Sequence, residues 1–143
     1  MAKSLKMRNK NIIITFMSLV MVLSSFSGFA QTPEETLIKK VQESLKSSSS
    51  RELVKYLHER VEIKLDNEKK DYSTNQAEIV LKQFFQKNPA DSTEFIHDSK
   101  SDGGIVYAIG SYVSGNKKYR VVIRAKQFKT DYKIYRLEFT EDR

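Results

Sequence analysis

Two neighbouring stretches, residues 105–114 and 117–128, are long runs of mainly strand-forming residues and predict the strands of a long β-hairpin. Gly115-Asn116 separates the stretches, and a two-residue loop of this composition favours a tight hairpin turn. A register centred on the loop creates one apolar face of mostly small residues, with the pairs Tyr112–Tyr119, Gly110–Val121, Ala108–Ile123 and Val106–Ala125. This face is expected to lie under a helix.

The opposite face of the predicted hairpin mixes basic, aromatic and apolar side chains. Its expected pairs are Ser111–Arg120, Ile109–Val122, Tyr107–Arg124 and Ile105–Lys126. A slip of one residue would exchange the two faces, so the contrast between them supports this register.

Two helices are predicted at the start of the folded region. The first begins at Thr32-Pro33-Glu34-Glu35, which combines a capping threonine, a proline in the first turn and a glutamate that closes a capping box. The serine run at residues 47–50 interrupts this helix and is interpreted as a solvated linker. Ser49 and Glu52 then indicate the start of a shorter second helix that ends near His58.

A third helix follows two short strands. The strands are predicted over Val61–Asp66 and Asp71–Ser73, and the helix begins at the capping pair Ser73 and Gln76. It ends at Asn88-Pro89, because the residue before a proline avoids helical geometry. Its apolar side consists of Ala77, Val80, Leu81, Phe84 and Phe85.

Two more strands flank the hairpin in the sequence. Residues 91–99 place Phe95 and His97 on one side and Ile96 on the other, if side chains alternate regularly. In the last strand, the same rule puts Tyr135, Leu137 and Phe139 opposite Ile134, Arg136 and Glu138. Helices and strands in this order, without βαβ alternation, predict an α+β fold of three helices packed on a curved antiparallel sheet.

Residues 1–30 have the pattern of a secretory signal peptide. Four basic residues precede an apolar run at 12–22, and small residues lead to Ala30, after which cleavage is expected. The alternative is an uncleaved membrane anchor, but the run is shorter than the ~20 residues of a full membrane span, which favours cleavage. No stable span is expected after cleavage. The sequence therefore predicts export to the periplasm or the extracellular space, with residues 31–143 as the single folded domain.

Removing the signal peptide changes the charge of the chain. The whole sequence has a net charge of +7, but residues 31–143 keep 21 basic and 18 acidic residues, which leaves +3. This small excess argues against nucleic-acid binding. The chain has no cysteine, so core packing has to stabilise the exported domain without disulfides.

Three segments carry a resemblance to known proteins: YSTNQAEIVLKQFFQKNP (Tyr72–Pro89), GGIVYAIGSYVSGNKKYRVVI (Gly103–Ile123) and IYRLEF (Ile134–Phe139). Through them, residues 34–140 resemble a family of exported bacterial proteins classed as a domain of unknown function. The order of elements also resembles the cone-shaped nuclear transport factor 2-like, or cystatin-like, fold. That resemblance implies a pocket between sheet and helices, which in ketosteroid isomerases and scytalone dehydratases handles protons, but it implies no reaction for this chain.

His97 is the best single candidate for acid–base catalysis, because imidazole titrates near neutral pH. In the enzyme hypothesis it acts in the cone pocket of a small-molecule lyase, isomerase or hydrolase. The other interpretation is a structural histidine, which we favour. Two histidines, no cysteine and no HExxH spacing predict no metal site, and no cofactor motif is present.

Basic and aromatic residues of the hairpin are the other candidates. Arg120, Arg124 and Lys126 share one strand face, and Tyr107 lies opposite Arg124, where a cation–π pair is expected. This face could bind anionic envelope polymers, serve for homodimerisation around Ile109 and Val122, or be merely solvated. The leading hypothesis is a non-catalytic exported domain that binds a small ligand or a protein partner, with His97, Tyr107, Arg120 and Arg124 as candidate binding residues.

Overall fold

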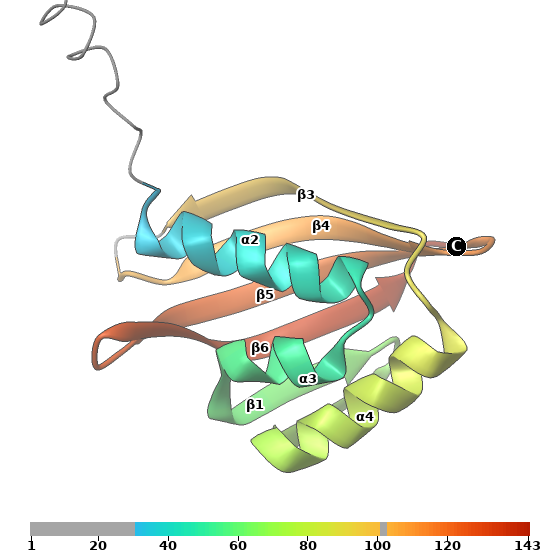
Figure 1. The fold of residues 1–143 in the computed structure, drawn as a ribbon, viewed down its shortest axis with the longest axis horizontal. Coiled ribbons are helices and arrows are strands. Elements are labelled where there is room, and N and C mark those ends of the chain that lie inside the picture. The colour runs from blue at the N-terminus through green and yellow to red at the C-terminus, as the bar shows by residue number, and fades with distance from the viewer. Residues whose placement is uncertain (1–30, 101–102) are drawn as a thin grey trace, which may run out of the picture. The chain divides into compact units, whose positions relative to one another are not determined.

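One six-stranded sheet forms the base of the fold in the computed structural model, which describes residues 31–100 and 103–143, except for the side chains of residues 97–100 (Figure 1). The strand order is β2-β1-β6-β5-β4-β3, so both strands of the central hairpin, β4 and β5, lie inside the sheet. Their bounds are β1 (Leu57–Leu65), β2 (Glu68–Ser73), β3 (Ser92–Lys100), β4 (Val106–Ser114), β5 (Lys117–Phe128) and β6 (Asp131–Glu141).

The hairpin of β4 and β5 has the predicted register. Tyr112 pairs with Tyr119 and Ala108 with Ile123, while Tyr107 pairs with Arg124 on the other face. Gly115 adopts a φ of 57°, the left-handed conformation that the tight turn requires. The small residues Val106, Ala108 and Gly110 are buried, as expected for a face that lies under helices.

Three α-helices of the described residues cover that face (Figure 1): α2 (Pro33–Lys46), α3 (Ser50–Leu53) and α4 (Thr74–Lys87). Thr32 and Ser73 cap α2 and α4 through complete capping boxes, which confirms both predicted starts. None of the helices in this part of the chain is long and apolar enough to cross a bilayer.

The second helix is shorter than predicted. After one turn of α3, the chain continues as the 3₁₀ turn η1 (Val54–Tyr56), and β1 already begins at Leu57. His58 therefore lies in a strand, and its predicted place at a helix end is wrong. The physical reason is a non-local contact: Leu57 of β1 pairs with Ile134 of β6.

The pairing of β1 with β6 is parallel, whereas every other pair in the sheet is antiparallel. The expected sheet was purely antiparallel, so this is a correction. A parallel pair needs a long crossover connection. Here β2, α4 and the other three strands provide it, because they separate β1 from β6 along the chain.

β-Bulges in β6 and β3 alter which side chains share a face. In β6 the partners of Arg124 and Ala125 are Arg136 and Ile134, so the intervening Tyr135 is the extra residue. Ile134 is consequently buried beside Leu137 and Phe139, and the expectation that Tyr135 takes this place is wrong. A bulge of one residue exchanges the two faces of a strand beyond it.

The bulge in β3 lies at Ile96. Phe95 pairs with Gly110 and His97 pairs with Ile109, which are neighbours in β4 and alternate between its two faces. The regular alternation predicted for Phe95 and His97 is therefore broken. Ile96 itself is 73% exposed.

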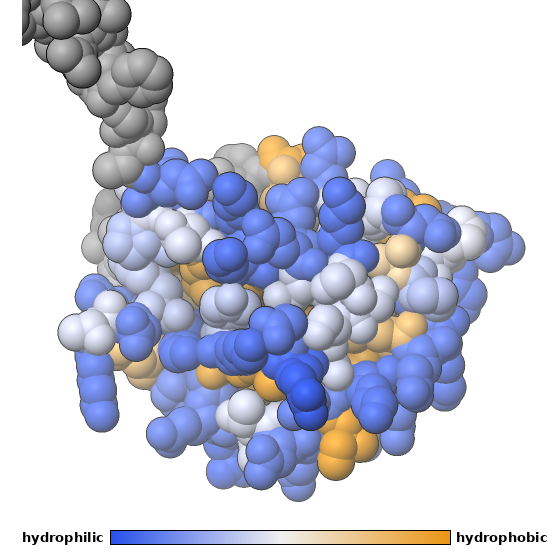
Figure 2. Space-filling view, in the orientation of Figure 1, coloured by the Kyte–Doolittle hydropathy of each residue, from blue (hydrophilic) through white to orange (hydrophobic). Residues whose placement is uncertain are grey.

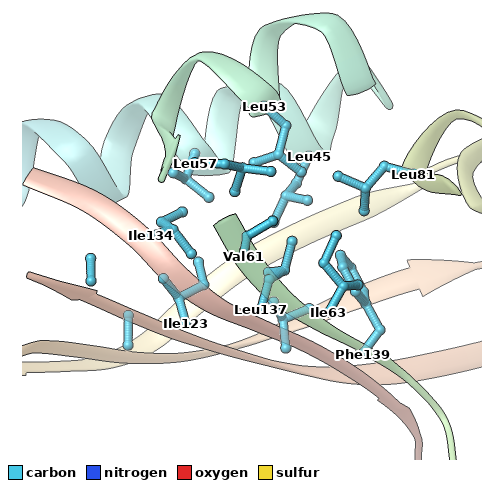
Figure 3. Close-up of a cluster of buried hydrophobic side chains, with 14 of the residues drawn as sticks. Leu45, Leu53, Leu57, Val61, Ile63, Leu81, Ile123, Ile134, Leu137 and Phe139 are labelled. Atoms are coloured by element: carbon cyan, nitrogen blue, oxygen red, sulfur yellow. The ribbon is translucent and has the colours of Figure 1, made fainter. Parts of the chain in front are cut away.

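The hydrophobic core fills the space between the helices and the sheet (Figure 3). Leu45 of α2 and Leu53 of α3 point towards Ile134 and Leu137 on the sheet, and Leu81 of α4 lies near Phe139. Each of these side chains is fully buried. Complete burial of a large aliphatic side chain is worth about 1.5–3 kcal/mol, so packing can stabilise the domain without disulfides.

The serine run is part of the structure and not a solvated linker. Ser48 has a φ of 51°, and its Oγ accepts a hydrogen bond from the Ala90 backbone N–H at 2.8 Å. Ser49 caps α3, and Ser50 is buried. The run thus joins α2 to α3 and holds the segment that follows α4.

Asn88 connects the end of α4 to the central hairpin. The Tyr112 hydroxyl donates to its backbone oxygen at 2.5 Å, and the Tyr119 hydroxyl donates to its Oδ1 at 3.0 Å. Both rings are buried among Phe84, Phe85 and Phe139. Burial raises the pKa of the Tyr112 hydroxyl above its ordinary value.

The raised pKa predicts a loss of stability at high pH. An unfolded tyrosine ionises near pH ~10, while Tyr112 stays protonated in the folded state, so the unfolded chain releases protons first. The contribution of Tyr112 to the free energy of unfolding is therefore complete below pH ~10 and is lost as the pH rises towards the pKa of Tyr112 in the folded state. Urea unfolding of the wild-type chain and of Tyr112→Phe at pH 8 and pH 10.5 (about half a unit above that value) checks this. The decrease in unfolding free energy should be smaller in the variant, and equal decreases would contradict the assignment.

Any side chain at Gly110 is predicted to destabilise the sheet. A Cβ at this position would lie 2.5 Å from the backbone oxygen of Glu94 and 2.7 Å from Cδ1 of Phe95, so β3 would have to move. Gly110→Ala should lower the unfolding free energy by about 1–3 kcal/mol, the usual cost of overpacking. Gly103→Ala is the matched control, because a Cβ there meets nothing within 4 Å. Similar urea midpoints for both variants would show that β3 adapts freely.

Candidate functional site

The sheet has one face that none of the described helices covers, and we call it the outer sheet face (Figure 1). Along β4, side chains of this face are half-buried and alternate with fully buried ones. The opposite, helix-covered side is mainly hydrophilic, and its apolar residues appear as small separate areas (Figure 2). The outer sheet face comprises Glu62, Lys64, Tyr107, Ile109, Ser111, Arg120, Val122, Arg124, Lys126, Tyr135, Arg136 and Glu138.

Arg124 and Tyr107 form the predicted cation–π pair. The guanidinium carbon lies 5.6 Å from the centre of the Tyr107 ring, and the two residues are direct cross-strand partners. The Nε atom of Arg124 is buried and has no hydrogen-bond partner among the described residues. A buried N–H without an acceptor lowers the stability of the folded state.

Glu62, an acidic residue two strands away from Arg124, is already engaged. Arg124 pairs with Arg136, whose Nε lies 2.5 Å from Oε1 of Glu62. Glu62 also lies 3.2 Å from the ammonium group of Lys69. Its charge is therefore shared by two cations, and neither Arg124 nor Arg120 forms an ion pair with a described residue.

Lys126 extends the row of cations over aromatic rings. Its Nζ lies 4.8 Å from the Phe128 ring centre and 5.6 Å from that of Tyr135. His58 stacks on Phe128, with ring centres 3.8 Å apart. Cationic and aromatic side chains thus lie next to one another across the sheet from β4 to β1, an arrangement suited to binding acidic or planar groups.

The His97 side chain lies outside the described residues, so its role stays a prediction. Its backbone pairs with Ile109 of β4. Within the part of the chain that the structure describes, no three His, Cys, Asp or Glu side chains gather as they would around a metal ion.

The hollow expected between sheet and helices is filled where Phe84 and Phe85 of α4 reach Tyr112 and Tyr119 of the hairpin. Tyr112 and Phe139 are fully inaccessible there, and Phe84 packs on both Tyr119 and Phe139, with ring centres 5.3 and 4.8 Å apart. Two cavities lined by described residues lie instead beside α3, one towards α4 and one towards α2.

The sequence pattern did not reveal Glu62, Tyr135 and Arg136 as neighbours of the predicted binding residues. Alternation along Val61–Leu65 does mark Glu62 as an outward position. Its contact with Arg136 depends on the parallel pairing of β1 with β6, for which the sequence has no local signal.

Comparison with known proteins supports the fold. Residues 38–140 match the family described as Domain of unknown function (DUF4783). None of the curated proteins matches the chain. Crystal structures of DUF4783 family proteins are similar: one from Bacteroides ovatus has a TM-score of 0.69 at 24% identity and covers 73% of this chain and 94% of its own. One from Bacteroides uniformis has a TM-score of 0.70 at 23% identity, over 73% of this chain and 96% of its own.

A nuclear transport factor 2-like protein of unknown function from Shewanella baltica is similar in fold as well. Its TM-score is 0.62 at 10% identity, and the match covers 78% of this chain and 92% of that one. The α+β architecture and the resemblance noted in the sequence are thereby confirmed. The chain belongs to the DUF4783 family and has a nuclear transport factor 2-like fold.

Proposed function

We propose that residues 31–143 form an exported, non-catalytic binding domain, released by cleavage after Ala30, that holds an acidic surface of a protein partner on its outer sheet face. The observation that carries the proposal is Arg124, whose Nε is buried without an acceptor among the described residues. A partner carboxylate bound to the guanidinium group would compensate for this through charge-assisted hydrogen bonds.

The surroundings of Arg124 have the composition of a protein interface. Ile109 and Val122 are cross-strand partners and give the face an apolar centre. Arg120 and Lys126 are exposed at its rim, and Tyr107 lies under the guanidinium. Tyrosine and arginine are enriched where binding energy concentrates, around a core depleted of other charges.

A second copy of the chain is one candidate for the partner. Glu138 lies on the same face as Arg124, as the direct partner of Val122. Two outer sheet faces could therefore exchange arginine–carboxylate pairs across a two-fold axis. An acidic protein of another kind would use the same cations, and the solution mass of the purified chain distinguishes the two.

Site-specific photocrosslinking in the exporting cell tests the face. A photoreactive residue in place of Val122 should give discrete adducts, whereas one in place of Ile79, exposed on α4, should not. Adducts from position 122 should decrease at least ~10-fold with Arg124→Met, because loss of a paired charge costs about 1.5–3 kcal/mol. Lys39→Met, which removes a cation from the exposed side of α2, should leave them unchanged.

The stability of the variants separates binding from folding. Because Arg124 forms no ion pair among the described residues, Arg124→Met should change the unfolding free energy by no more than about 1 kcal/mol, the cation–π contribution. Adducts that are equal at positions 122 and 79, or unaffected by Arg124→Met, would contradict the proposal. Adducts that double the chain mass identify the second copy as the partner.

A further inference from the structure

A cavity of about 400 Å³ lies between α3 and α4, away from the outer sheet face. Its walls are the serine run with Arg51 on one side, and Glu78, Lys82 and Gln86 of α4 on the other, and Phe85 forms part of the lining. Ligand sites for small molecules have volumes of roughly 300–1,000 Å³, so this cavity has room for a compact ligand.

Ser50 lines this cavity, and its hydroxyl has no hydrogen-bond partner among the described residues. The residue as a whole is only 8% exposed. The neighbouring serines differ, since Ser49 Oγ accepts from the Glu52 N–H at 3.2 Å and Ser48 Oγ accepts from the Ala90 N–H. The cavity therefore presents one hydroxyl whose hydrogen-bonding capacity is unused within the described structure.

The charged residues of the cavity are likewise separate from one another. Glu78 and Lys82 are four residues apart on α4, a spacing at which such side chains commonly pair. They do not pair, and Arg51 has no ion-pair partner among the described residues either. Elsewhere on the helices, close pairs do form, such as Lys55 Nζ with Glu52 Oε1 at 2.7 Å.

We propose that this cavity binds a small zwitterion of the amino-acid or dipeptide class. The ligand carboxylate would lie between Arg51 and Lys82, its ammonium group at Glu78, and Ser50 would hydrogen-bond the polar backbone of the ligand. A neutral sugar would leave all three charges unpaired, and a phosphate would leave Glu78 unpaired beside a second anion. A zwitterion satisfies both signs of charge together, which neither alternative does.

Isothermal titration calorimetry of the purified chain with L-alanyl-L-alanine tests the proposal. N-acetyl-L-alanyl-L-alanine lacks the ammonium group and L-alanyl-L-alaninamide lacks the carboxylate, so each should bind at least ~10-fold more weakly than the free dipeptide. Inorganic phosphate serves as the probe for a purely anionic site. Absence of dipeptide binding, equal binding of the two blocked forms, or tighter binding of phosphate would overturn the proposal.

Variants of the lining residues assign the contacts. Glu78→Gln should abolish the preference for a ligand with a free ammonium group, and Lys82→Met should abolish the preference for a ligand with a free carboxylate. Ser50→Ala should weaken the binding of the dipeptide without changing either preference. Lys87→Met is the matched control, because it removes an exposed cation from the same helix outside the cavity. Thermal unfolding of each variant should remain that of the wild type, as Glu78 and Lys82 form no ion pair. Loss of binding in Lys87→Met equal to that in Lys82→Met would refute the assignment.

Discussion

The pairing of β5 on both of its edges is the constraint on which the remainder of the structure depends. β4 and β6 occupy the two edges of this strand, so it cannot shift by one residue without exchanging its faces. Tyr119, Val121, Ile123 and Ala125 consequently all point into the core. A helix can pack on that face with any suitable apolar stripe. The register of β5, in contrast, determines which side chains of the sheet form the face.

Asn88 shows how this constraint reaches the helices. It ends α4 and accepts hydrogen bonds from Tyr112 and Tyr119, cross-strand partners in the hairpin. The rings thereby lie inside the domain and contribute to the core. Nuclear transport factor 2-like folds can enclose a pocket in this region, but here aromatic side chains fill the part that α4 covers. Two other places are therefore left for binding, the outer sheet face and the cavity beside α3.

These two places share a physical property. Arg124 has a buried donor, and Ser50 has a hydroxyl in the wall of the cavity, that the described residues leave without a partner. A domain selected for stability alone would pair such groups or replace them by apolar ones, because unpaired buried polar groups lower stability. Positions of this kind commonly serve recognition, where a second molecule supplies the missing partner.

Local sequence signals determined the elements of this protein: capping boxes began α2 and α4, Gly115-Asn116 centred the hairpin, and alternation separated Tyr107 and Arg124 from the core. Regular alternation was misleading at Tyr135 and Ile96, because a bulge depends on the partner strand and not on the residue itself. The parallel contact between β1 and β6, the early end of α3, and the pairing of Glu62 with Arg136 were decided only by the tertiary structure. They join residues more than seventy positions apart, and no local pattern encodes the energy of such a contact.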